Sequence, residues 1–234
     1  GWLVNRSLQK AFLEGKTSTP SVHSDFNTPE YTHNRVMTAK KWETCRGLGY
    51  SFGYNRNETA EHMLSVEALV RMLVDIVSKN GNLMLSVPVR HDGTIDEDEV
   101  KTVSAIGAWL KVNGEAVYAT RPWKSYGEGP STTSAEKGQF DGQKDVHSKP
   151  LTAEDIRFTQ SKDGKTLYAI VLGWPADGKV TIKSLATGAA NAPEKIGSVR
   201  LLGGGKLKFT RDANGLTVNF PAKQPCASAF ALRI

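Results

Sequence analysis

The sequence contains only two cysteines, Cys45 and Cys226, and they lie far apart in the chain. Two cysteines form at most one bridge, so a disulfide-rich scaffold is excluded, and the thiols alone assign no redox compartment. Long hydrophobic runs are also missing. A membrane-spanning helix needs about 20 consecutive apolar residues, and no segment reaches that length, so we expect no membrane span.

Signatures of metal, phosphate and serine-nucleophile sites are missing as well. The five histidines have none of the spacings typical of zinc ligands. Asp25 and Glu30 could share a cation, but no further oxygen ligands cluster near them in the sequence. The only glycine run, 203–205, is typical of a turn, and no nucleophile elbow is present. We therefore expect no metal and no other cofactor.

The excess of positive charge is modest and dispersed. Thirty Lys and Arg residues against 24 Asp and Glu residues give a formal charge of +6. Basic residues alternate with acidic ones such as those at 96–99, and no basic stripe or nucleic-acid-binding motif accompanies them, so we expect no nucleic-acid partner. A hydrophobic content of 39% and 234 residues are typical of a globular protein with room for two modest domains.

The first half of the chain predicts alternating helices and parallel strands. Apolar residues at helical spacing predict a helix over 65–79 and a second over 97–112, which Asp96 caps. Val100, Val103, Ile106 and Leu110 are expected on the inner face of the second helix. The short apolar run 82–87 between the helices predicts a strand buried on both faces, as in a parallel sheet. This order is typical of a (β/α) barrel, in which residues 7–31 would form a long loop after a strand at 2–4.

The second half predicts a different architecture. Residues 124–143 are rich in Gly, Ser, Thr and charge, which is typical of a linker. Further on, Asp-Gly or Asn-Gly pairs at 163–164, 177–178 and 214–215 separate alternating runs, and such pairs favour β-hairpins. The predicted fold class is therefore α/β plus all-β: the C-terminal portion of a (β/α) barrel followed by an antiparallel β-sandwich. The predicted division is barrel portion 1–123, linker or extended loop 124–150, and sandwich 151–234.

Two acids lie beside aromatic residues in segments punctuated by Gly and Pro, a combination typical of sugar-cleaving sites. They are Glu30, next to Tyr31, and Glu43, next to Trp42. A carboxylic acid can protonate a departing glycosidic oxygen, and an aromatic face can pack on the apolar face of a sugar. Purely structural roles stay open: Glu30 as a solvated loop carboxylate, and Glu43 as a carboxylate satisfied by backbone or arginine groups.

Several segments in this order resemble glycoside hydrolase family 29, the α-L-fucosidases. They are Val4-Asn5-Arg6, the run Asp25-Phe26-Asn27-Thr28-Pro29-Glu30-Tyr31, Lys41-Trp42-Glu43-Thr44-Cys45, Ser51-Phe52-Gly53-Tyr54-Asn55 and the stretch 109–118. Residues 155–175 are similar to the start of the family's C-terminal sandwich. One departure is the stretch 86–90, Ser-Val-Pro-Val-Arg, where many members carry Asn-Ile/Val-Gly-Pro.

The resemblance implies a retaining α-L-fucosidase that removes terminal α-L-fucose from glycoconjugates. It assigns Glu30 as the general acid/base, Arg6 and Phe52 as fucose-binding residues, and Glu43 as a second-choice acid or a structural residue. The family's nucleophile is an Asp on an earlier barrel strand, and no position of this chain matches it. We therefore expect the nucleophile upstream of Gly1 and this chain to be a C-terminal fragment that is inactive alone.

The expected partners are a fucosylated glycan or oligosaccharide and the missing N-terminal part of the barrel. The alternative function is a non-catalytic carbohydrate-binding remnant or a partner chain. The residues themselves assign no compartment, and the family is typically secreted, periplasmic or lysosomal. The same resemblance gives no linkage preference and no oligomeric state.

Overall fold

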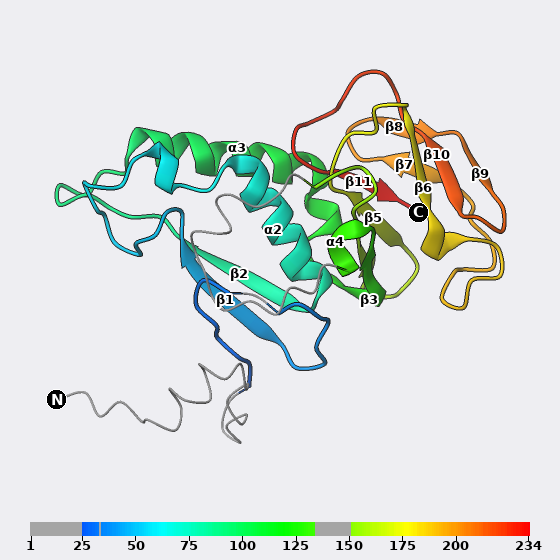
Figure 1. Ribbon diagram of the computed structural model, residues 1–234, viewed down its shortest axis with the longest axis horizontal. Coiled ribbons are helices and arrows are strands. Elements are labelled where there is room, and N and C mark those ends of the chain that lie inside the picture. Colours follow the sequence, from blue (N-terminus) through cyan, green and yellow to red (C-terminus); the bar gives the residue numbers. More distant parts are fainter. Residues whose placement is uncertain (1–24, 33, 134–150) are drawn as a thin grey trace.

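A computed structural model describes residues 25–32, 34–133 and 151–234 (Figure 1). Its first half alternates strands and helices: β1 (Trp42–Gly47), α2 (Val66–Ser78), β2 (Gly81–Ser86) and α3 (Glu97–Asn113). β1 and β2 pair in parallel, with Trp42 opposite Gly81 and Gly47 opposite Ser86. The predicted strand–helix alternation is confirmed. Within the described ranges, no helix combines the length and apolar character needed to cross a membrane.

A third parallel segment extends this small sheet. Residues 25–31 were predicted to lie in a long loop, but Asn27 forms a parallel bridge with Trp42 and Glu30 with Cys45. The amide of Glu43 donates to the carbonyl of Asn27 over 2.8 Å. The loop prediction is thus wrong for residues 27–30. They pair with β1 through backbone groups, and such pairing leaves no pattern of side chains in the sequence. The predicted strand at 2–4 lies outside the described residues.

Both predicted helices form, and their caps explain where they begin. The Ser65 hydroxyl accepts from the Ala68 amide over 3.1 Å, and the Asp96 carboxylate accepts from the Asp98 amide over 3.0 Å. These bonds satisfy amides that lack a partner in the first turn.

The inner face of α3 agrees with the prediction in part. Ile106 and Leu110 pack against the core as predicted, but Val100 and Val103 are 48% and 40% exposed, whereas Glu99, Trp109 and Asn113 are buried. The strand β2 is also only partly buried, since Met84 is 50% exposed. Apolar spacing therefore located these elements but gave their buried faces only in part.

The second half is a β-sandwich, which confirms the predicted all-β architecture. One sheet has the order β3-β4-β5-β11-β7-β8 and the other the order β6-β10-β9. The strands are β3 (Thr120–Glu128), β4 (Ile156–Ser161), β5 (Leu167–Val171), β6 (Lys179–Ile182), β7 (Val199–Leu201), β8 (Gly205–Leu207), β9 (Phe209–Arg211), β10 (Leu216–Asn219) and β11 (Phe230–Arg233). The short helices are η1 (Ala60–His62), η2 (Gly114–Ala116), α4 (Pro130–Thr133) and η3 (Lys183–Leu185).

The strand β3 corrects the start of the predicted linker. Residues 124–128, assigned to the linker, form the second half of β3, which pairs with β4. The register shifts between Pro122 and Gly127, so the strand is irregular in its middle. The strand contains Pro, Gly and several polar residues, which are uncommon inside strands, so the sequence did not predict it. Residues 134–150 of the predicted linker lie outside the described residues.

The six-stranded sheet is covered on both faces. One face joins the three-stranded sheet through a core that includes Phe158 and Leu216, and the other packs on α2 and α3 through Ile170, Val74 and Trp109. Figure 1 shows the sandwich strands gathered at one end of the molecule, with α2 beside the edge that carries β3. The α/β portion and the sandwich therefore share buried surface.

Candidate active site

Three parallel segments end at the same edge of the small sheet. They end at Glu30, Gly47 and Ser86, and the loops 48–64 and 87–96 leave from there. In α/β folds, the loops at the carboxyl ends of parallel strands form the ligand-binding face. The sequence-predicted residues Glu30 and Phe52 both lie at this edge.

Glu30 is held at its backbone and exposed at its side chain. The Cys45 amide donates to the Pro29 carbonyl over 3.0 Å, and the Tyr31 amide donates to the Cys45 carbonyl over 2.9 Å. The peptide units on both sides of Glu30 are therefore fixed to β1. A carboxylate with a fixed backbone and an open side chain can approach a ligand and exchange protons with water.

Tyr31 connects Glu30 to Phe52. The Tyr31 backbone has a φ of +52°, and its ring meets the Phe52 ring edge-on with centroids 4.8 Å apart. The Arg46 guanidinium lies 5.4 Å from the Tyr31 ring centroid, and burial raises the pKa of the Tyr31 hydroxyl. Phe52 itself is 38% exposed, so part of this residue is accessible from solvent. The Ser86 hydroxyl donates to the Phe52 carbonyl over 3.0 Å and ties this loop to the end of β2.

Glu43 lies deeper in the sheet than Glu30. It is half-buried on β1, on the same face as Cys45, while Trp42 and Thr44 are buried on the other face. Burial raises the pKa of the Cys45 thiol, and the charges of Glu30 and Glu43 raise it further. The negative charges of both carboxylates thus disfavour the thiolate form of Cys45. Glu30 at the edge is the more exposed of the two acids.

The two cysteines are free thiols. Burial also raises the pKa of Cys226, although the Asn113 side chain, 3.3 Å from its sulfur, opposes that shift. A raised pKa disfavours the thiolate, which is the nucleophilic form of cysteine. Neither thiol therefore has the character of a catalytic nucleophile.

The remaining predicted site residue, Arg6, lies outside the described residues. His62, for which no role was predicted, has a local structural role, because its Nδ1 accepts from the Thr59 amide over 2.9 Å. In the ranges that the structure describes, no three His, Cys, Asp or Glu side chains converge to hold a metal ion.

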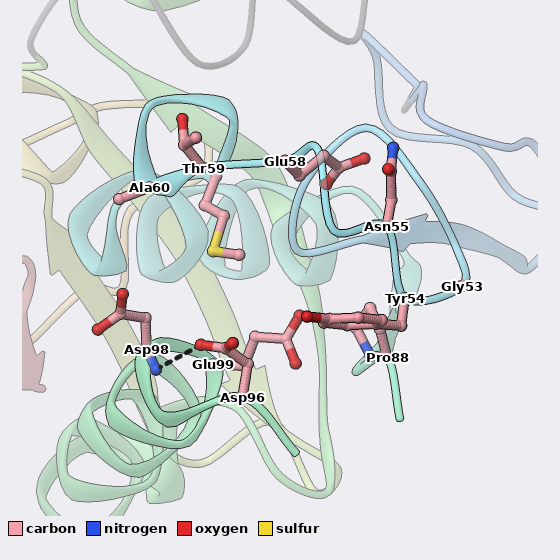
Figure 2. A pocket seen from close by; sticks show the side chains of 11 residues that line it. Gly53, Tyr54, Asn55, Glu58, Thr59, Ala60, Pro88, Asp96, Asp98 and Glu99 are labelled. Atoms are coloured by element: carbon pink, nitrogen blue, oxygen red, sulfur yellow. Dashed lines mark hydrogen bonds between the residues drawn. The ribbon is translucent and has the colours of Figure 1, made fainter. Parts of the chain in front are cut away.

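Sequence reasoning missed a pocket beside this edge. It lies between the loop carrying Gly53, Tyr54 and Glu58 and the start of α3, and has a volume of about 120 Å³. Figure 2 shows Glu58 on the loop side and Asp96, Asp98 and Glu99 on the helix side. Glu58 and Glu99 are distant in sequence and belong to no recognised motif, so only the fold brings them to one pocket.

Comparison with known proteins matches nearly the whole chain to one family. A model of the family described as "Alpha-L-fucosidase" matches residues 2–115, and one described as "Alpha-L-fucosidase C-terminal domain" matches residues 148–234. The chain is 31% identical over 245 residues to plasma alpha-L-fucosidase of Pongo abelii, covering 100% of this chain and 47% of that protein. It is 31% identical to the human plasma enzyme, covering 91% of this chain and 41% of that protein.

A solved structure gives the same result. The crystal structure of Thermotoga maritima alpha-fucosidase in complex with a mechanism-based inhibitor superposes with a TM-score of 0.70 at 34% identity. The superposition covers 93% of this chain and 44% of that chain. The present chain therefore spans less than half the length of these relatives.

Proposed function

Because the chain belongs to the α-L-fucosidase family, we propose that the complete gene product is a retaining α-L-fucosidase acting on terminal fucose of glycans. Glu30 serves as the general acid/base, and the nucleophilic Asp lies outside these 234 residues. One observation supports this most directly: Tyr31, the neighbour of Glu30, packs on Phe52, so an open carboxylate and an open aromatic ring share one edge of the sheet.

The proposed reaction has two steps. In the first, Glu30 donates a proton to the departing glycosidic oxygen while the nucleophile forms a covalent bond to the sugar. In the second, Glu30 removes a proton from the water that releases fucose. The two carboxyl groups must then stand about 5–5.5 Å apart. Phe52 packs on the apolar side of fucose, and Arg6 binds the sugar.

The small sheet supports a site completed by further chain. Among the described residues β2 pairs with β1 alone, so its outer edge has no strand partner there. A (β/α) barrel closes its sheet completely. We propose that the missing barrel strands cover this edge and bring the nucleophile opposite Glu30.

Glu30→Gln in the complete gene product tests the assignment, with Glu43→Gln as its control. General acid catalysis contributes about 10²–10⁴-fold, so Glu30→Gln is expected to lower kcat/KM by that factor on a natural fucosyl linkage. The loss should be smaller for 4-nitrophenyl α-L-fucoside, whose leaving group needs little protonation. If Glu43→Gln shows this leaving-group dependence and Glu30→Gln does not, the roles are reversed.

The length of the chain relative to its relatives favours one second candidate. The 234 residues as they stand could be a non-catalytic, carbohydrate-binding portion or a partner chain. Release of 4-nitrophenol by the folded 234-residue protein separates the two cases. No release agrees with a nucleophile outside the chain. Release that disappears in Glu30→Ala would show that a second catalytic carboxylate is already present.

A further inference from the structure

The pocket between the loop carrying Gly53 and the start of α3 contains carboxylate oxygens that no described residue satisfies. Glu99 is 3% exposed, and its Oε2 accepts no hydrogen bond within the part of the chain that the structure describes. On the loop side, Glu58 accepts from the Tyr50 amide through Oε2, over 3.3 Å, but its buried Oε1 likewise has no partner among the described residues. Buried acceptors without partners are costly, so each such oxygen requires an explanation.

The four acids that line the pocket are not equivalent. Asp96 pairs with Arg90 over 2.5 Å, and Asp98 pairs with Lys101 over 3.0 Å. Neither Glu58 nor Glu99 has an ion pair in the described residues. The pKa of Glu99 is raised, mainly by burial and further by the charges of Asp96 and Glu58. The Asp96 amide, by hydrogen bonding, and the Arg90 charge oppose this shift without reversing it. The two carboxylates therefore repel each other, and neither forms an ion pair with a described residue.

We propose that this pocket binds an ammonium or guanidinium group, which hydrogen-bonds to Glu58 and Glu99 at once. Neutral hydroxyl groups would leave the two negative charges uncompensated, whereas an organic cation supplies both the charge and several N–H donors. A metal ion requires at least three ligands at about 2.0–2.6 Å, and in the described ranges no three acidic, His or Cys side chains converge in that way.

The walls of the pocket fit a small cationic head group. Tyr54, Met63 and Pro88 supply apolar and aromatic surface around the acids, and the volume of about 120 Å³ suits a group of a few heavy atoms. The group could belong to a soluble amine or to a lysine or arginine side chain from a part of the protein outside these 234 residues. The inference stands apart from the proposed glycosidase activity, since it depends on none of the residues assigned to that reaction.

The test is a titration of the ¹⁵N-labelled 234-residue protein with methylammonium chloride, followed by amide chemical shifts, with sodium chloride at equal ionic strength as the reference. The expected result is saturable shifts at Glu58, Thr59 and Glu99 with a Kd of about 1 mM. Glu99→Gln and Glu58→Gln should each weaken binding about tenfold or more, because each removes a charged acceptor.

Glu97→Gln is the matched control, since Glu97 is an exposed acid in the first turn of the same helix and does not line the pocket. It should leave the Kd within about twofold, far below the effect of a lost charged hydrogen bond. An equal loss in all three variants would show only a non-specific charge effect and would overturn the proposal. If Glu99→Gln does not fold, as judged by circular dichroism, Glu58→Gln decides the result.

The same titration of the complete gene product distinguishes the sources of the cation. Binding in both forms identifies a soluble amine as the ligand. Binding only in the 234-residue protein shows that a lysine or arginine side chain from the rest of the protein occupies the pocket. Absence of saturable binding in both forms, with Glu99→Gln as stable as the wild type, would mean that Glu99 is simply protonated, and the proposal would be wrong.

Discussion

At the scale of single residues, Gly47 is the position that lets Tyr31 and the loop after β1 approach the sheet. A Cβ at Gly47 would collide with the Ser51 carbonyl oxygen and lie 3.0 Å from the Tyr31 hydroxyl oxygen. The carbonyl belongs to the backbone, so it cannot rotate away. The contact between Tyr31 and Phe52 therefore depends on the absence of a side chain at residue 47.

Gly47→Ala is expected to lower the free energy of unfolding by about 1–3 kcal/mol, the usual cost of overpacking. Gly53→Ala is the control, because a Cβ at Gly53 meets no atom within 4 Å, and its effect should stay within about 0.5 kcal/mol. Urea denaturation of both variants measures the difference. Equal stability of the two variants would show that the loop adjusts freely and that Gly47 does not position Tyr31.

Asp155 makes the stability of the sandwich depend on pH. Burial alone would raise the pKa of its carboxyl group, but hydrogen bonds outweigh burial and the pKa is lowered. The donors include the amides of Ser131, at 2.8 Å, and Thr152, at 3.0 Å. The unfolded chain, with a pKa of about 3.9, therefore binds the proton more readily than the folded protein. The contribution of Asp155 is present above about pH 4 and is lost as the pH falls through the lower, folded pKa.

Replacing Asp155 with Asn should lower stability at pH 7 by about 1–3 kcal/mol, since a charged acceptor of buried hydrogen bonds is lost. The urea midpoint of the variant should also fall less steeply than that of the wild type below pH 4. Denaturation curves at pH 7, 4 and 3 measure both effects. Parallel pH dependence in the two proteins would assign the acid sensitivity to other carboxylates.

At the scale of secondary-structure elements, a buried ion cluster joins α2 to β4. The Asp75 carboxylate lies 2.6 Å from the Lys79 amine and 2.6 Å from the Arg157 guanidinium. Tyr126 of β3 covers the cluster, with its ring centroid 4.9 Å from the Lys79 amine. Removing one member of a buried ion cluster leaves uncompensated charge in a poorly solvated place, which costs about 3–5 kcal/mol.

Asp75→Ala is therefore expected to destabilise the protein by about 3–5 kcal/mol. Asp98→Ala breaks an ion pair on α3 whose side chains are 73% and 58% exposed, and it should cost less than about 1 kcal/mol. Guanidinium chloride would screen the surface pair, so urea is the denaturant of choice. A small loss in Asp75→Ala would show that water reaches Lys79 and Arg157 and replaces the carboxylate.

The elements that the sequence predicted well are those with a strong local signal. Helical spacing and caps located α2 and α3. The pairs at 163–164 and 214–215 form the predicted hairpins β4–β5 and β9–β10, but the hairpin predicted at 177–178 is wrong, because this turn leads from β5 to β6 in the other sheet. Residues 27–30 and β3 were missed because their pairing depends on a distant strand rather than on their own residues. At the site, Glu30 and Phe52 are assigned through family resemblance and stay a prediction, whereas Glu58 and Glu99 line one pocket only through tertiary structure.

At the scale of the whole molecule, the α/β portion and the sandwich share one buried layer. Ile170 of β5 packs with Val70 and Val74 of α2, and the Trp109 indole of α3 donates to the Ala229 carbonyl over 2.8 Å. The sequence-based division into 1–123 and 151–234 implies two units that could unfold separately. The shared layer instead predicts that opening one exposes apolar surface of the other, so that both unfold together.

Native-state hydrogen exchange of Val74→Ala tests this cooperativity. The cavity should cost about 2 kcal/mol, and the free energy of opening should fall equally for the slowest amides of α2 and of β10. β10 is a stringent reporter because it belongs to the three-stranded sheet and lies beyond the layer that contains Val74. Val218→Ala on β10 is the reciprocal variant. It should lower the free energy of opening of the slowest α2 amides by as much as it lowers the stability of the whole protein. If each substitution affects only its own half, the two portions are independent folding units and the shared layer is a docking surface between them.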